Sequence, residues 1–192
     1  TGVALDGRQP HLHGMGSNQN GGAYRTYSLE NPRQLTTAYY PADKSRQDYT
    51  HDGAATVITD ERAGTQCNVG GGNGACDVFA DFNEQEMRLW DQTVPSQPEQ
   101  LASISYAGAS YVHSGWWTED NKHIFLHDEL DEQNSGINTR VYVFNVEDLS
   151  APFEAGRYEG PSRAIDHNGF VRGNRYYMSN YQRGVTVLDI TN

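Results

Sequence analysis

The sequence predicts an all-β fold, a β-propeller built from four-stranded antiparallel blades. Two observations lead to this prediction. Aromatic and β-branched residues alternate with polar ones in short runs, such as Arg140 to Phe144, and this alternation is typical of strands. A motif of an apolar or aromatic residue, a spacer, His, a small polar residue and Gly also occurs three times, at 49–53, 111–115 and 165–169. The spacing of roughly 55 to 60 residues suits the repeats of a propeller.

The segment from Tyr111 to Gly160 shows one complete repeat. Turn-rich or acidic segments separate four expected strands, at 114–118, 123–128, 139–145 and 153–158. A second motif, an alternating strand that ends in Asp or Asn, follows each copy of the first. It occurs at Met87–Asp91, Val141–Asn145 and Val185–Asp189. One antiparallel meander of four strands is therefore the expected repeating unit.

About four copies of this unit are visible in a single propeller domain or propeller segment. We place them approximately at 1–48, 49–110, 111–164 and 165–192. The first copy matches only loosely, and the last supplies three expected strands, at 170–172, 175–179 and 185–190. Four blades are the lower limit for a closed propeller. We therefore expect the chain to be part of a larger propeller.

Charge and hydropathy exclude several classes of partner. The formal net charge is −11, which argues against sequence-independent binding to nucleic acid or to an anionic membrane. No apolar run is long enough to span a bilayer, so we expect no direct membrane insertion. Such an acidic surface suits cations or basic partners.

The two cysteines, Cys67 and Cys76, enclose a glycine-rich stretch. A disulfide between them would hold this stretch in shape by lowering the entropy of the unfolded chain. Two free thiols are the alternative. A disulfide would place the protein in an oxidising compartment, as a secreted, periplasmic or bacterial cell-surface protein.

The histidines of the first motif are candidate metal ligands. The innermost strand of each propeller blade begins beside the central channel, so His51, His113 and His167 are expected to converge there. Imidazole is a common ligand of transition metals, and the neighbouring Asp52 and Asp166 suit the orientation of a second ring nitrogen. The alternative is structural, with each histidine bonding the backbone of a neighbouring loop in the same way.

The acidic segment from His127 to Asn138 is a second candidate site. Carboxylate and amide oxygens clustered on a loop suit calcium, and Asp128, Asp131 and Asn134 are the expected ligands. The order of residues is not that of an EF-hand loop, so the signal is one of composition. A solvated acidic turn is the alternative.

No catalytic residues are assigned from sequence motifs. Ser114 follows His113 directly, and neighbours on a regular strand face opposite sides, so the two are not expected to form a catalytic pair. The G-x-S-x-G elbow is absent, and no glycine-rich stretch precedes a helix pattern that would cradle a phosphate.

Several of these segments together resemble the bacterial LVIVD-repeat proteins known as the choice-of-anchor B family. The segments are 49–53, 111–120, 128–132, 138–140 and 165–168. The run from Gly184 to Ile190 looks like the repeat that names the family, although Thr186 and Leu188 depart from it. The resemblance covers most of 49–192. It implies a β-propeller on an exported protein, sometimes tethered by a separate anchor, and it implies no established reaction.

These observations favour an extracellular or cell-surface binding module, stabilised by calcium, with a protein or carbohydrate ligand. The alternative is a metal-dependent enzyme, an oxidoreductase or hydrolase, that uses a transition metal in a histidine-lined central channel. A third prediction is self-association through blade edges, as in a surface polymer.

Overall fold

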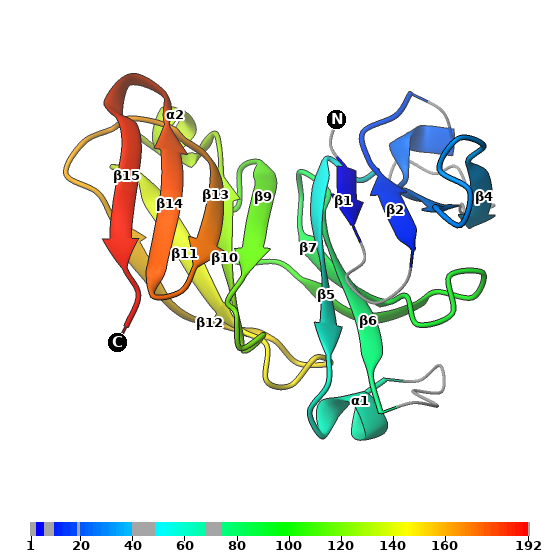
Figure 1. Ribbon diagram of the computed structural model, residues 1–192. Helices are drawn as coiled ribbons and strands as arrows, with labels where there is room; N and C mark the ends of the chain where they lie inside the picture. Colours follow the sequence, from blue (N-terminus) through cyan, green and yellow to red (C-terminus); the bar gives the residue numbers. More distant parts are fainter. Residues whose placement is uncertain (1–2, 6–9, 19, 40–48, 68–73, 192) are drawn as a thin grey trace. The chain divides into compact units, whose positions relative to one another are not determined.

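The chain is all-β and has the β-propeller fold, with four antiparallel sheets of three or four strands as its blades. The computed structural model describes residues 3–5, 10–18, 20–39, 49–67 and 74–191 (Figure 1). These residues divide into two compact units. The first comprises Thr1–Asn83 and Met87–Ser103, and the second comprises Glu84–Glu86 and Ile104–Asn192. None of the helices in the described part has the length and apolar character needed to cross a membrane.

The first unit contains two sheets in which consecutive strands pair. The strands of one sheet are β1 (Val3–Leu5), β2 (His11–Gly14), β3 (Arg25–Ser28) and β4 (Thr36–Tyr39). Those of the other are β5 (Asp52–Ile58), β6 (Cys76–Phe82), β7 (Met87–Asp91) and β8 (Glu99–Ile104), whose last residue falls to the second unit. A 3-10 turn, η1 (Asn20–Gly22), precedes β3, and the short helix α1 (Arg62–Thr65) follows β5. Strands β1 and β5, the first of each sheet, lie in contact.

The second unit repeats this plan. One sheet consists of β9 (Val112–Trp117), β10 (His123–Asp128), β11 (Arg140–Asn145) and β12 (Phe153–Glu159). The other consists of β13 (Asp166–Arg172), β14 (Arg175–Asn180) and β15 (Gly184–Asp189), with the 3-10 turn η3 (Tyr181–Arg183) before its last strand. The first strands, β9 and β13, again pack together. Figure 1 shows the colours advancing strand by strand across each sheet, as a meander requires.

Two of the three motif glycines, Gly53 and Gly169, make room for aromatic rings from the next strand of the same sheet. A Cβ atom on Gly53 would lie 2.3 Å from Cζ of Phe79, and one on Gly169 would lie 2.1 Å from the hydroxyl oxygen of Tyr176. Both rings are fully buried. Phe79 packs with Met15 in the core of the first unit, and Tyr176 packs in the core of the second. At these two positions, therefore, a ring lies across the backbone where a side chain would be.

The all-β prediction is confirmed, and the three strands expected in the last copy are present. The first strand of that copy begins at Asp166, four residues before the expected Phe170, because a bulge interrupts but does not end its pairing with β14. The acidic segment is also not simply a loop, since it contains the one-turn helix α2 (Asp131–Ser135). Gly136 ends this helix with φ of 66°, and its N–H donates to the carbonyl of Glu132.

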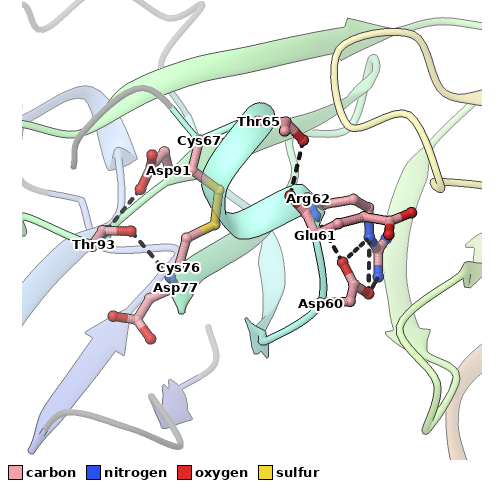
Figure 2. Close-up of a disulfide and its surroundings, with 9 residues drawn as sticks. All are labelled: Asp60, Glu61, Arg62, Thr65, Cys67, Cys76, Asp77, Asp91 and Thr93. Carbon is pink, nitrogen blue, oxygen red and sulfur yellow. Dashed lines mark hydrogen bonds and ion pairs between the residues drawn. A yellow bond between two sulfur atoms is a disulfide. The ribbon is translucent and has the colours of Figure 1, made fainter. Parts of the chain in front are cut away.

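The predicted disulfide between Cys67 and Cys76 is present (Figure 2). It joins the segment just after α1 to the first residue of β6. Beside it, the buried Arg62 donates from Nη2 to Asp60 Oδ2 at 2.7 Å, and the backbone N–H of Arg62 donates to Oδ1 of the same carboxylate at 3.0 Å. Residues 68–73, which the disulfide encloses, lie outside the described residues.

Candidate functional site

Two β-bulges position motif histidines in the second unit. In β9, Ser114 pairs with His127 and Val112 with Asp128, so His113 is an extra residue between two neighbouring pairs. In β13 the register also shifts between Asp166 and Gly169, the interval that contains His167. A bulge bends its strand and redirects a side chain. At these two histidines, successive side chains therefore do not alternate between the two faces of the sheet as they do on a regular strand.

His113, His167 and Glu129 form the group that we call the two-histidine cluster. Glu129 directly follows β10. Its Oε2 lies 3.4 Å from Nε2 of His113, and its Oε1 lies 3.8 Å from Nε2 of His167. The two imidazole rings are 4.5 Å apart between centroids. Both histidines thus present the same ring nitrogen to one carboxylate.

Hydrogen bonds to Nδ1 of each imidazole indicate which ring nitrogen carries the proton. Nδ1 of His113 lies 3.0 Å from the backbone carbonyl oxygen of His167. A carbonyl only accepts, so Nδ1 of His113 carries the proton and Nε2 has the lone pair when the ring is neutral. Nδ1 of His167 lies 3.1 Å from Nδ2 of Asn168, which is a donor. That contact leaves the Nε2 proton of neutral His167 facing Glu129.

Ser114 contacts the same carbonyl as His113. Its hydroxyl donates to the carbonyl oxygen of His167 at 2.7 Å. On a regular strand the two neighbours would face opposite sides, but the bulge brings both to one acceptor. The serine is therefore a donor to the backbone here, and the described contacts do not make it a nucleophile activated by His113.

Aromatic side chains border the two-histidine cluster. The Tyr181 hydroxyl donates to Oε1 of Glu129 at 2.5 Å, and its ring meets the ring of His167 edge to face. The ring of Tyr111 stacks on His113 at 6.0 Å between centroids. His113 is 5% exposed, whereas His167 and Glu129 are half-buried. A pocket of about 290 Å³ opens beside the cluster and is lined by His167, Ser179, Asn180, Tyr181, Gly184 and Val185.

The donor set and its spacing suit a divalent transition metal. One ligand atom from each of the three residues lies within 4.8 Å of the other two. Two ligand atoms bound about 2.0–2.1 Å from a tetrahedral zinc ion lie about 3.3 Å apart, close to the nitrogen-to-oxygen distances above. Two imidazoles and a carboxylate leave further coordination positions open for water or a ligand.

The third motif histidine, His51, belongs to the first unit. It directly precedes β5, its N–H donates to the carbonyl of Phe82 at 2.8 Å, and its Nδ1 lies 3.4 Å from the hydroxyl of Tyr49. The convergence of His51 with His113 and His167 stays a prediction.

The expected calcium ligands have three different surroundings. Asp128 is fully buried and accepts bonds from the Tyr106 hydroxyl at 2.8 Å and from the N–H groups of Ser110 and Tyr111 at 2.7 and 2.6 Å. Asn134, on the exposed side of α2, donates to the Ser110 hydroxyl at 2.5 Å. Asp131 is buried and lies beside other carboxylates. Calcium binding by the expected set of three stays a prediction.

Sequence reasoning missed Glu129, although it saw the acidic run 128–132. The composition of the run predicted a single loop, either a calcium site or a solvated acidic turn. In the structure its members diverge, because Asp128 ends a strand, Glu129 turns toward the histidines and Asp131 begins a helix. The signal that marks Glu129 is its place one residue after a strand adjacent to the bulged strand β9.

No protein-family model and no curated protein sequence matches this chain. Solved structures do match it. A chain of the nidogen–laminin complex is 12% identical with a TM-score of 0.56, and the match covers 98% of this chain and 59% of that one. A protein from Lactobacillus plantarum is 14% identical with a TM-score of 0.60, covering 97% and 54%. The periplasmic gluconolactonase of Pseudomonas aeruginosa is 13% identical with a TM-score of 0.63, covering 97% and 52%.

These similarities concern the fold alone, because the identities are low. This chain spans a little over half the length of each of the three chains that it matches.

Proposed function

We propose that this chain is a binding module of an extracellular β-propeller protein, and that the two-histidine cluster holds a divalent transition-metal ion at its ligand-binding surface. The observation that carries the proposal is the approach of both Nε2 atoms to the carboxylate of Glu129. The adjoining pocket supports it, because a ligand lying there would reach the open coordination positions of the ion.

The hydrogen bond of His113 favours a metal over a simple ion pair, and His167 presents an Nε2 lone pair to the same ion once the Asn168 amide turns its oxygen toward Nδ1. A histidine that binds a metal usually gives its other ring N–H to a carbonyl or carboxylate, which fixes the ring. His113 does so with the carbonyl of His167. The Tyr181 hydroxyl holds Glu129 in a similar way. His113 can therefore bond the backbone through Nδ1, as the structural alternative expects, and bind a metal through Nε2 at the same time.

Extracellular location is supported by the disulfide between Cys67 and Cys76, since such bonds persist in oxidising compartments. The sequence resemblance to the exported LVIVD-repeat, choice-of-anchor B proteins points the same way, and a structurally similar propeller is named as periplasmic. We propose a protein or carbohydrate as the ligand. The strongly negative net charge favours a basic or neutral one.

Metal titration of the chelator-treated chain tests this proposal. We expect calorimetry to show one zinc ion bound per chain, and His167→Gln and Glu129→Gln to weaken that binding by at least about tenfold. His123→Gln is the matched control, because His123 lies on β10 in the same unit but outside the cluster. Zinc binding that His167→Gln leaves unchanged, or that His123→Gln weakens equally, would exclude the cluster as the site.

A second candidate function is metal-dependent hydrolysis. The similarity to a periplasmic gluconolactonase favours it, together with the open coordination positions and the pocket. Ring opening of a lactone consumes one water and releases a hydroxy acid, so its rate is measurable as acid production at constant pH. Zinc-dependent turnover of glucono-δ-lactone that is lost in His167→Gln would show that the chain is a hydrolase and not a binding module.

A further inference from the structure

Three buried carboxylates meet at a second place in the second unit. Asp131 and Glu132 begin α2, and Asp166 begins β13. Their exposed fractions are 1%, 3% and 0%. One ligand atom from each lies within 4.8 Å of the other two. We call these three residues the carboxylate cluster. It shares no residue with the two-histidine cluster.

Each carboxylate has one oxygen held by the protein. Oδ2 of Asp131 accepts from the Tyr142 hydroxyl at 2.9 Å. Oδ2 of Asp166 contacts Nδ1 of His127, whose Nε2 in turn contacts the Tyr176 hydroxyl. Oε1 of Glu132 lies 3.4 Å from the N–H of Asp166, a long hydrogen bond. These contacts fix the orientation of the carboxylates.

The second oxygen of each carboxylate is buried and has no hydrogen-bond partner. These atoms are Oδ1 of Asp131, Oε2 of Glu132 and Oδ1 of Asp166. In the described part of the chain, no Lys or Arg forms an ion pair with any of the three residues. An unpaired buried oxygen costs about 1–3 kcal/mol, and an unpaired charge costs more. Three such oxygens in one place therefore need a cation or protons.

We propose that the carboxylate cluster binds a calcium ion that joins α2 to β13. Calcium takes carboxylate oxygens at about 2.3–2.6 Å, so ligands on opposite sides of the ion lie up to about 5 Å apart, which accommodates the observed spacing. All three donors are hard oxygens, which suit calcium better than zinc or copper. The site retains Asp131 from the ligands expected from the sequence and replaces Asp128 and Asn134 with Glu132 and Asp166.

Protons are the competing way to neutralise the cluster. Burial raises the pKa of Asp131 to about 8 and that of Glu132 to about 8, and it raises the pKa of Asp166 well above its usual range. Without a cation, burial therefore favours the protonated forms of these carboxyl groups. A bound ion would displace these protons.

Thermal unfolding of the full chain, first freed of metal with a chelator, tests this proposal. We expect about 1 mM calcium, the range used by extracellular calcium-binding modules, to raise the midpoint of unfolding of the wild type. Glu132→Gln keeps the shape of the side chain and removes its charge. We expect it to fold without calcium and to lose about 100-fold or more of the calcium affinity measured by calorimetry.

Two controls separate this site from others. Glu147→Gln, an exposed acid paired with Lys122, should keep the full calcium response. The calcium response is measured without zinc, so failure of the zinc site would leave this result intact. A wild type whose midpoint and calorimetric signal do not change with calcium would overturn the proposal and favour protons. A calcium response that Glu132→Gln retains in full would overturn it as well.

Discussion

Replacement of Gly53 by alanine tests whether the motif glycine exists to accommodate an aromatic ring. The new Cβ would lie 2.3 Å from Cζ and 2.6 Å from Cε2 of Phe79, and 2.8 Å from the carbonyl oxygen of Ala80. Carbon atoms in comfortable contact are about 3.5–4.0 Å apart. The ring or the strand would therefore have to move by more than about 1 Å.

The surroundings of Phe79 resist such a movement. Its ring is 0% exposed and packs against His13 and Tyr24, with centroid distances of 4.9 and 4.8 Å. Extra methyl groups in a packed core typically cost about 1–3 kcal/mol. We expect a loss at the upper end, about 3 kcal/mol, because the close contacts include backbone. For a chain of this length, that corresponds to a fall of about 6–12 °C in the unfolding midpoint.

Urea unfolding with the matched substitution Gly156→Ala measures this effect. A Cβ on Gly156, an exposed position in β12, would have no atom within 4 Å, so we expect alanine there to be neutral or to stabilise by up to about 1 kcal/mol. Combining Gly53→Ala with Phe79→Leu should cost less than the sum of the two single changes, since a smaller side chain relieves the overlap. A Gly53→Ala protein that is as stable as the wild type would refute this explanation of the glycine at position 53.

Three further changes have effects that the structure specifies. Burial, with a smaller contribution from His11, lowers the pKa of His13 from 6.5 to about 4, so its neutral form stabilises the fold above pH 6.5 and this contribution is lost as the pH falls toward 4. The loss is at most about 3 kcal/mol. The free energy of unfolding of the wild type, minus that of His13→Gln, should fall by that amount between pH 6.5 and about 4. A difference that stays constant over this range would contradict the assignment. Replacing Cys67 and Cys76 by alanine opens a loop with a sequence separation of 9 and should cost about 2.5 kcal/mol in thermal unfolding, whereas an unchanged midpoint would deny the disulfide a stabilising role. Asp128→Asn places an amide among three hydrogen-bond donors and should lower the free energy of unfolding in urea by about 2–4 kcal/mol. We expect the same loss with and without calcium. A loss confined to calcium-containing buffer would instead make Asp128 a calcium ligand.

Alternation of residue types predicted the strands and the repeated motif predicted the blades, because strands in a meander pair with their neighbours in sequence. The strand at 123–128 was predicted with its observed bounds, and that of 153–158 ends one residue later in the structure. The glycines at positions 53 and 169 were visible in the sequence, but the reason for them was not. The ring that requires each glycine, Phe79 or Tyr176, comes from another strand, and the pairing register decides which ring lies there.

The candidate sites depended on features that local sequence does not encode. Bulges in β9 and β13 redirect His113 and His167, and a bulge depends on how two strands pair. The side chains of the acidic run 128–132 lie in separate surroundings, because a strand ends, a turn follows and a helix begins within these five positions. Composition therefore pointed to residues of both proposed sites, but the proposed sites combine them with others that the sequence did not single out as ligands, Glu129 with the histidines and Glu132 and Asp166 with Asp131.

The proposed function depends most on a metal ion at the two-histidine cluster. Anomalous diffraction at the zinc edge, from crystals grown after adding zinc to the chelator-treated chain, locates that ion directly. We expect a peak bonded to Nε2 of His113, Nε2 of His167 and an oxygen of Glu129, at about 2.0–2.2 Å from each. An anomalous map with no peak at these three residues, in crystals where they stay within ion-pair distance of one another, would contradict it.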